Sequence, residues 1–287
     1  MKEAPTIHLV TYATPQFRHR QWFLGLSARA NHVVDNVTSW TPSRLMEQGF
    51  GQRAPEIELT SRGSGFWAWK PFIIEWHLNR VRDGDIVFYC DVGRHNGFKL
   101  LESSINSLIG WMDQNKQDML PGLLIPWKGP MSMWTKRNAF VLTGMDSSEA
   151  HQATPIQASF SIWRASGASR DMIGQWMNWC AQPQLINDER GDPGFPELQD
   201  FVDHRHDQSL LTLCCLNKKI QGLDLGSMMP PIDTQHPCEV NSWLQGSNRA
   251  KTSWKGLMVR TAALPFEMIE KGIRRTVRIG EPPPTST

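Results

Sequence analysis

The sequence has no apolar run long enough for a membrane helix and no cysteine spacing of the kind that binds zinc. A membrane helix needs about 18 or more consecutive apolar residues, and no stretch of this chain approaches that length. The N-terminal apolar run is also too short and too interrupted for a secretory signal. The cysteines are odd in number and lack a CxxC pair: Cys90, Cys180, Cys214, Cys215 and Cys238. This pattern favours free thiols in a reducing compartment, so we expect a cytoplasmic protein.

The chain also lacks a strong charge of either sign, and it has very little tyrosine. Its formal charge of +2 gives no basis for general nucleic-acid binding, so we expect no nucleic-acid partner. The 287 residues, 40% of them hydrophobic, suffice for one large α/β domain or for a domain with an appended subdomain. Thirteen Trp against two Tyr is unusual. We expect most of the indoles in the core, with a few as candidates to line a sugar or base site.

Short apolar runs that resemble strands alternate with helical spacing up to about residue 180. The runs lie at Ile7–Ala13, His32–Trp40, Ile86–Cys90, Leu123–Ile125 and Gln157–Arg164. Helical spacing follows several of them, as after Pro15 and from Ala168 to Cys180. Such alternation predicts an α/β protein with a mainly parallel sheet that helices cover on both faces.

Residues 62–93 combine a small loop, a helix and a buried strand. The loop Gly63-Ser64-Gly65 is flexible enough for backbone N–H groups to approach a ligand closely. A helix then opens at Trp67–Pro71, where Lys70 adds a positive charge to free backbone donors and the helix dipole. The loop matches neither a Walker motif nor a dinucleotide fingerprint, because Lys70 precedes no Ser or Thr and position 68 is not Gly.

The strand that follows brings Asp91 to the carboxyl edge of the predicted sheet, where open α/β folds bind ligands. The end of the first strand, Thr11–Thr14, should lie on the same edge. An anion cradle and a carboxylate would then meet at one place, which suits a metal-bound diphosphate. In the alternative interpretation the loop is a plain turn, the tryptophans belong to the core, and Asp91 only closes a strand.

A second polar cluster lies late in the chain. Seven consecutive polar residues, 203–209, directly precede the apolar helix Leu210–Leu216. Polar groups beside a buried helix are costly unless they bind a ligand or one another, and an N-terminal cap explains only one of them. Asp207 is therefore a functional candidate, against a capping or salt-bridge role. For each histidine, a structural role is the simpler hypothesis, with a His-x-His metal site as the alternative.

These segments together resemble a known family. A Gly-rich loop runs into Trp67-Ala68-Trp69-Lys70-Pro71, and Gly84-Asp85-Ile86 leads to Tyr89, Asp91 and Gly93. Trp134-Thr135-Lys136 follows, and the last motif is His204-Arg205-His206-Asp207-Gln208-Ser209. Each motif is weak alone, but the ordered set resembles GT-A-type glycosyltransferases found among bacterial and viral surface-glycan genes. The resemblance covers about residues 5–220.

The resemblance implies roles for particular residues. The donor nucleotide sugar would be held by Thr11, Tyr12, Arg62, Ser64, Gly65, Trp69, Lys70, Asp91 and Gly93. Asp207, or Asp203, would be the catalytic carboxylate near the acceptor. The acceptor or the donor sugar would contact His206, Gln208, Trp134 and Lys136. Gly93 replaces the second Asp of the family's Asp-x-Asp motif, which leaves two alternatives: a divalent cation, Mn²⁺ or Mg²⁺, binds Asp91 with His236 as a further ligand, or Lys and Arg side chains neutralise the diphosphate without a metal.

The C-terminal part of the chain has a different composition. We expect a GT-A-like domain over residues 1–235, a basic and partly helical extension over 236–280, and a disordered tail over 281–287. Residues 249–280 contain eight Lys or Arg against two Glu, a local charge of +6. Leu264–Val277 could form a basic helix on an acidic lipid surface, which would place the protein peripherally on the inner membrane face, although a solvated helix is the simpler interpretation.

The leading functional hypothesis is a nucleotide-sugar-dependent glycosyltransferase acting on a glycan or lipid-linked acceptor in surface polysaccharide synthesis. A nucleotidyltransferase that makes nucleotide sugars is a second hypothesis, but it would need a Gly-rich basic loop after the first strand, and residues 11–18 contain no glycine. A third hypothesis is a non-catalytic glycan-binding protein on the same fold, which the missing second Asp favours. The donor, the acceptor, the stereochemical outcome and the oligomeric state are not encoded in any pattern we find.

Overall fold

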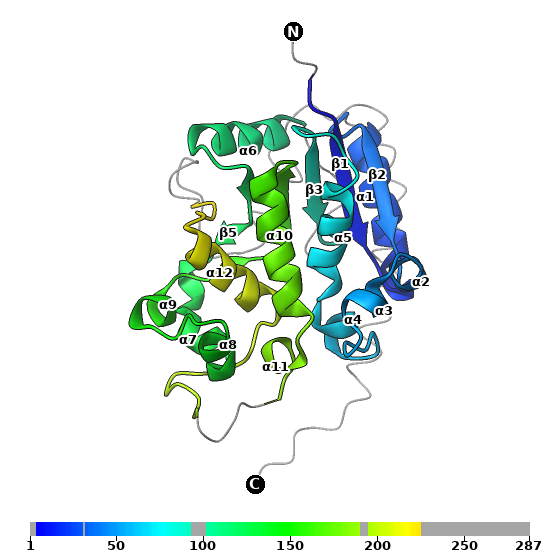
Figure 1. The fold of residues 1–287 in the computed structure, drawn as a ribbon. Helices are drawn as coiled ribbons and strands as arrows, with labels where there is room; N and C mark the ends of the chain where they lie inside the picture. Colours follow the sequence, from blue (N-terminus) through cyan, green and yellow to red (C-terminus); the bar gives the residue numbers. More distant parts are fainter. Residues whose placement is uncertain (1–3, 31, 93–101, 190–194, 225–287) are drawn as a thin grey trace, which may run out of the picture.

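The structure is a computed structural model that describes residues 4–30, 32–92, 102–189 and 195–224 (Figure 1). Its centre is a five-stranded sheet with the strand order β2-β1-β3-β7-β4. The strands are β1 (Ile7–Tyr12), β2 (Asn36–Trp40), β3 (Ile86–Cys90), β4 (Met119–Leu120) and β7 (Phe160–Arg164). A second, two-stranded sheet pairs β5 (Leu123–Leu124) with β6 (Ile156–Gln157).

The main sheet is mixed, with mostly parallel strands. β1 pairs in parallel with β2 and with β3, and β7 runs antiparallel between β3 and β4. Four of the five strands therefore point in one direction. The predicted α/β class, with a mainly parallel sheet flanked by helices, is confirmed. The predicted strand Gln157–Arg164 is divided at Ala158 and Ser159, so that its two parts, β6 and β7, belong to different sheets.

Helices cover both faces of the main sheet. The helices of the structure, apart from the short segment α4 described below, are α1 (Arg18–Ala30), α2 (Pro42–Glu47), α3 (Phe50–Arg53), α5 (Trp69–Leu78), α6 (Glu102–Gln114), α7 (Met131–Trp134), α8 (Arg137–Leu142), α9 (Ser148–Gln152), α10 (Gly167–Cys180), α11 (Pro183–Ile186) and α12 (Asp207–Lys218). Two 3-10 turns precede α1 and α7, at Pro15–Phe17 and Pro126–Lys128. In Figure 1 α5 and α10 run side by side in front of the sheet, and α10 also packs on α12.

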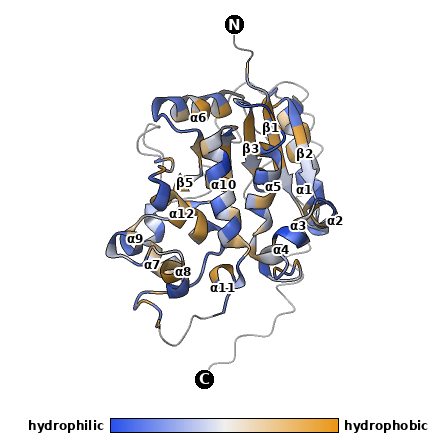
Figure 2. Ribbon diagram, viewed as in Figure 1, coloured by the Kyte–Doolittle hydropathy of each residue, from blue (hydrophilic) through white to orange (hydrophobic). Residues whose placement is uncertain are grey.

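The alternation of side chains along the strands divides the core in two. Val10 and Tyr12 of β1, together with Tyr89 of β3, face the core that α5, α10 and α12 complete. The neighbouring residues of the same strands, such as Leu9 and Phe88, face a second core closed by α1 and α6. In Figure 2 the central strands are mostly orange, and the helices carry blue residues on other parts of their surfaces.

The domain boundaries lie outside what the structure can describe. Residues 225–287 include the last part of the predicted 1–235 domain, the basic extension 236–280 and the tail 281–287, and these predictions fall outside the described residues. Within the described residues, no helix combines the length and the apolar character needed to cross a membrane.

Candidate functional site

The Gly/Ser loop is a left-handed turn. It forms the short segment α4 (Arg62–Phe66), and its φ angles are positive at five successive residues, from Gly63 at 64° to Trp67 at 60°. A left-handed conformation costs L-residues about 1–2 kcal/mol each, and glycine adopts it without this cost. Glycine is also required sterically, because a Cβ on Gly63 would lie 2.4 Å from the ring of Trp67. The turn therefore depends on its glycines.

This turn forms one wall of a cavity of about 510 Å³ at the carboxyl ends of β1 and β3. We call it the sheet-edge cavity; its walls include Tyr12, Ser64, Trp67, Trp69 and Asp91. The Tyr12 hydroxyl lies 2.7 Å from Ser64 Oγ, and the Tyr12 and Trp69 rings stack with centroids 4.0 Å apart. Burial raises the pKa of Tyr12, although the hydrogen bond to Ser64 opposes this. Both rings are thus fixed in place, and they give the cavity an aromatic wall.

Behind the inner wall lies an ionic cluster centred on Lys70, which we call the Lys70 cluster. Lys70 Nζ is 2.7 Å from Asp207 Oδ2 and 3.9 Å from Asp91 Oδ1, and it donates to the carbonyl oxygen of Ala158 at 2.9 Å. The hydroxyl of Tyr89 donates to the same Asp91 oxygen. One ammonium group thus joins the start of α5, the end of β3, the start of α12 and the β6–β7 connection.

The charges in this cluster shift the pKa values of its members. Burial lowers the pKa of Lys70, but the charges of Asp207 and Asp91 outweigh it, so that the net shift is upward. Burial raises the pKa of Asp207 to about 6, although Lys70 acts in the opposite direction. Burial and the charge of Asp91 raise the pKa of Tyr89 well above its usual value. At neutral pH the cluster therefore holds a charged Lys70 and a protonated Tyr89.

The two carboxylates of the cluster differ in accessibility. The side chain of Asp91 is 31% exposed and lines the sheet-edge cavity. The side chain of Asp207 is 6% exposed and does not line that cavity. Asp207 is the first residue of α12, where the helix dipole favours a negative charge. Asp91 is therefore accessible from the cavity, and Asp207 is separated from it by Lys70.

Asp203 and Arg62 lie at the surface end of the site. Arg62 is 3.4 Å from both Asp203 Oδ2 and Asp188 Oδ1, and Arg205 approaches Asp203 at 3.8 Å. All of these contacts involve partly exposed side chains, so each adds little to stability. Arg62 therefore connects the left-handed turn to the late polar segment, and neither Arg62 nor Asp203 is among the residues lining the sheet-edge cavity.

The two histidines of the late segment brace neighbouring loops. The ring of His206 lies against Phe66 and Trp67, at centroid distances of 5.2 and 5.5 Å, and its Nδ1 is 2.8 Å from the carbonyl oxygen of Ile186. His204 accepts from the Lys136 backbone N–H and contacts the carbonyl oxygen of Leu185. Burial lowers the pKa of both imidazoles. These contacts agree with the structural interpretation of the histidines.

Lys136 is similarly committed to the fold. Its ammonium group donates to the backbone oxygen of Asn187 at 2.9 Å, to Asn187 Oδ1 at 2.8 Å and to the carbonyl oxygen of Glu189 at 3.3 Å. Burial lowers the pKa of this lysine to about 8. Its contacts anchor the chain after α11. Lys136 lines neither the sheet-edge cavity nor the smaller cavity beside Trp134 that is described next.

The other predicted residues fall into three groups. Trp134 and Gln208 line a second cavity of about 180 Å³, which we call the Trp134 cavity. Thr11 is buried on the face of β1 opposite Tyr12, and Gly65 packs against Ile57, so neither lines the sheet-edge cavity. Gly93 and His236 lie outside the described residues.

Sequence reasoning missed Tyr89 and the residues around Trp134. Tyr89 precedes Asp91 by two positions, and residues two apart on a strand share a face, so the period of the strand could have identified it as the partner of Asp91. Arg205 lies in the late polar run, but no comparable signal marks Trp127 or Lys128 or connects them with Arg205, because these residues come from segments far apart in the chain.

The described residues do not form a divalent-cation site by themselves. Among them, no group of three or more His, Cys, Asp or Glu side chains is placed to hold a metal ion. The carboxylates of Asp91 and Asp207 already share the ammonium group of Lys70. A hard cation prefers six or more oxygen ligands, and a neighbouring ammonium group opposes its binding.

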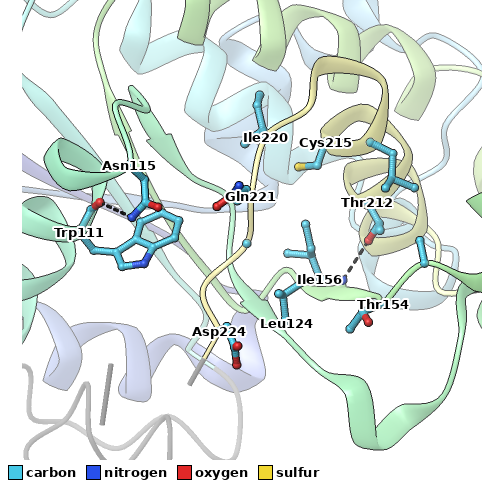
Figure 3. Close-up of a pocket in the computed structure, with 13 residues that line it drawn as sticks. Trp111, Asn115, Leu124, Thr154, Ile156, Thr212, Cys215, Ile220, Gln221 and Asp224 are labelled. Carbon is cyan, nitrogen blue, oxygen red and sulfur yellow. Dashed lines mark hydrogen bonds between the residues drawn. The ribbon is translucent and has the colours of Figure 1, made fainter. Parts of the chain in front are cut away.

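A third cavity, of about 430 Å³, lies apart from the candidate residues (Figure 3). Its walls come from α6, the two-stranded sheet, the end of α12 and the segment up to Asp224. Figure 3 shows the hydrogen bond between Thr212 and Ile156 on one side and Trp111 with Asn115 on the other. None of the predicted site residues lines this cavity.

The fold and the arrangement at its carboxyl edge define an α/β protein with a ligand-sized cavity beside a buried ionic cluster. Among solved structures, the chain is similar to that of the galactosyltransferase LgtC in complex with donor and acceptor sugar analogues. The match has 12% identity and a TM-score of 0.33, and it covers 87% of this chain and 99% of that one. No protein-family model matches the sequence, and no curated protein matches it.

Proposed function

We propose that this chain is a glycosyltransferase that moves a sugar from a nucleotide-diphosphate donor to a hydroxyl group of a glycan or lipid-linked acceptor. The supporting observation is that three separate segments converge on the sheet-edge cavity, through Tyr12 at the end of β1, Ser64 in the left-handed turn and Asp91 after β3. The cavity combines aromatic walls with a few fixed polar groups, as small-molecule sites do. A role in surface polysaccharide synthesis is the part of this proposal that rests on the sequence resemblance alone.

The Lys70 cluster supplies the charges that this chemistry needs. Glycosyl transfer passes through a positively charged, oxocarbenium-like sugar, and the departing diphosphate needs a compensating positive charge. In our proposal Lys70 provides that charge from behind the cavity. Asp91 is the carboxylate that the substrates reach: it accepts the proton of the acceptor hydroxyl if the reaction inverts, or holds a donor-sugar hydroxyl if it retains.

Asp207 acts through Lys70 in this scheme. Its carboxylate is buried, and it keeps the ammonium group beside Asp91 and the Ala158 carbonyl. This assignment differs from the role that the sequence resemblance implies, in which Asp207 takes the proton from the acceptor. Burial is the reason for the difference, because a proton acceptor must come within hydrogen-bond distance of the reacting hydroxyl.

A thermal-shift screen with UDP-, GDP-, CMP- and dTDP-sugars, each with Mn²⁺ and with EDTA, tests the proposal. A donor at 100 times its dissociation constant should stabilise the fold by about 2.7 kcal/mol. We expect stabilisation by one class of donor, and a weaker effect in Asp91→Asn. The matched control is Asp118→Asn, which removes another partly exposed carboxylate that pairs with an arginine, Arg164, away from the cavity. A folded sample that responds to no donor would contradict the proposal.

One observation favours the non-catalytic alternative, in which the protein binds glycans or nucleotide sugars without turnover. The late carboxylate that the resemblance assigns to catalysis is buried and already paired with Lys70. Release of free nucleotide from the donor, measured with and without added glycans, separates the two functions. Binding without any turnover across the acceptors would support the alternative, and nucleotide release that Asp91→Asn abolishes would support the transferase.

A further inference from the structure

The Trp134 cavity has walls of the kind that bind a single sugar ring. Two indoles, Trp127 and Trp134, and two side-chain amides, Gln157 and Gln208, line it. Flat aromatic faces pack on the C–H faces of sugar rings, and amides hydrogen-bond with hydroxyl groups in both directions. The volume of about 180 Å³ is comparable to that of one hexose in solution. The cavity therefore fits one residue of a glycan.

The charged residues of this cavity are all positive. Lys128 and Arg205 line it, and no carboxylate does so among the residues that the structure describes. The ammonium group of Lys128 forms no ion pair with any residue that the structure describes. Arg205 lies over the ring of Trp134, 4.6 Å from its centroid, and among the described residues it approaches one carboxylate oxygen, that of Asp203 at 3.8 Å. This excess of positive charge favours a ligand that carries a negative charge.

Hydrogen-bonding groups of the cavity also have unused capacity. The indole Nε1 of Trp127 is buried and has no hydrogen-bond partner among the described residues. Within the same part of the chain, the side-chain amides of Gln157 and Gln208 make no hydrogen bond. Buried donors are almost always paired, by protein, by water or by a ligand. Such unpaired groups beside a cavity indicate a polar occupant.

The walls of the cavity are held by hydrogen bonds to one another. Trp134 donates from its Nε1 to the carbonyl oxygen of Lys128 at 2.7 Å. The carbonyl oxygen of Trp134 accepts from the Arg205 backbone N–H at 3.0 Å and from Ser209 Oγ at 2.6 Å. Lys128, Trp134 and Arg205 are therefore positioned together before any ligand arrives, which lowers the entropic cost of binding.

The cavity is also close to the Lys70 cluster on the side away from the donor. Gln208 directly follows Asp207, and Gln157 directly precedes Ala158, whose carbonyl oxygen accepts from Lys70. Asp91, on the other side of Lys70, lines the sheet-edge cavity. The two cavities thus lie on different sides of one ionic cluster.

From these observations we infer that the Trp134 cavity binds one residue of the acceptor glycan, other than the residue whose hydroxyl reacts at Asp91, and that the bound residue is a saccharide carrying a negative charge, as a uronic acid or a sugar phosphate does. Lys128 and Arg205 bind the anionic group, and the tryptophans bind the ring. This inference rests on the proposed function, because it assigns the second substrate of the same site.

NMR titration of the full chain tests the charge preference directly. The probes are methyl β-glucuronide and methyl β-glucoside. They differ only at C6, which belongs to a carboxylate in the first and to a hydroxymethyl group in the second. We expect the glucuronide to bind about tenfold more tightly, the factor that corresponds to one charge-assisted hydrogen bond. Glucose 6-phosphate identifies whether a phosphate serves as well as a carboxylate, and acetate measures the binding of the anion without the sugar.

The variant Lys128→Ala should remove the preference for the glucuronide. The matched control is Lys218→Ala, an exposed lysine in the last turn of α12, at the opposite end of that helix from Asp207. Equal binding of glucuronide and glucoside would overturn the inference, as would a preference that survives Lys128→Ala or acetate binding as tight as that of the glucuronide.

The donor screen separates a failure of this inference from a failure of the proposed function. If a nucleotide sugar stabilises the protein and the protein binds the glucuronide no more tightly than the glucoside, only the assignment of an anionic acceptor is wrong. If the glucuronide binds in a Lys128-dependent manner and no donor stabilises the fold, the cavity is a saccharide site and the transferase function is wrong.

Discussion

Lys70 connects more of the candidate site than any other side chain described above. Its ammonium group contacts two carboxylates and a backbone carbonyl from three different segments, although its own side chain is almost completely buried. A buried charge is tolerated only when it is paired and hydrogen-bonded. Loss of either partner would leave an uncompensated charge, which typically costs about 3–5 kcal/mol. Lys70 thus serves the fold as well as the proposed chemistry.

The titration of Asp207 gives a prediction with a definite sign. Its pKa of about 6 in the folded protein lies above the value of about 3.9 for an unfolded chain. Between these values the folded state binds more protons than the unfolded state, so protonation stabilises the fold as pH falls. We expect the free energy of unfolding of the wild type, relative to Asp207→Asn, to rise by about 2–3 kcal/mol from pH 6 to pH 4.

Urea unfolding of both proteins across this pH range measures the difference, and Asn at position 207 removes the titrating group while keeping its shape. A relative stability that falls as the solution becomes more acidic would contradict the prediction. That result would mean that the attraction of Lys70 exceeds the effect of burial, and that the pKa of Asp207 is lowered.

At the scale of single residues, the sequence indicated which side chains to examine but not how they pair. Lys70 and Asp207 were both candidates, through a helix start and a late polar run. Their contact depends on how α5 and α12 approach one another, which no local pattern encodes. The exposures of Asp91 and Asp207 are likewise a product of tertiary packing, so the choice between the two carboxylates required the structure.

Among the elements, the left-handed turn at 62–67 has the most direct effect on the cavity. Its five positive φ angles direct Ser64 toward Tyr12 and place Trp67 in the wall. The sequence predicted a flexible Gly/Ser loop there. It did not predict the handedness, because Phe66 and Trp67 are not residues that normally adopt positive φ.

Gly63→Ala should destabilise the protein by more than Gly84→Ala does. Both glycines have positive φ, so both substitutions incur about 1–2 kcal/mol of backbone strain. A Cβ at position 84 meets nothing within 4 Å, whereas a Cβ at position 63 meets the Trp67 ring. We expect about 1–3 kcal/mol of additional loss for Gly63→Ala from this clash, measured by urea unfolding. Equal losses in the two variants would mean that the ring moves aside freely.

The strands illustrate where sequence patterns suffice and where they do not. The runs at β1 and β3 are continuous and apolar, as expected for strands buried on both faces, and the structure has them in the predicted places. The antiparallel direction of β7 was not predictable from its own residues. It follows from the short connection through Ala158 and Ser159, which leads out of a strand in the other sheet.

For the whole molecule, the predicted domain of residues 1–235 should fold without the remainder of the chain. The main sheet, both cores and both cavities flanking Lys70 are complete within the residues described up to 224. We expect residues 1–235 to unfold cooperatively with a midpoint near that of the full chain. A chain ending at residue 206 is the control, because it lacks α12 with its buried Leu210, Leu211 and Leu213.

Thermal unfolding followed by circular dichroism compares the three chains. Residues 1–235 that fail to fold, while the full chain does, would show that the domain boundary is wrong. The control should lose cooperative unfolding, since α12 packs on α10 in the larger core and carries the partner of Lys70.

The contact between Lys70 and Ala158 has a consequence for how such a site can be mapped. The ammonium group binds the peptide oxygen of residue 158 and no atom of its side chain. Every substitution leaves that oxygen in place, so a mutational scan reports Lys70 as essential and remains silent about its partner. Side-chain mutagenesis therefore cannot detect the contribution of the Ala158 carbonyl oxygen. Replacement of the peptide bond itself, for instance by an ester, would measure it.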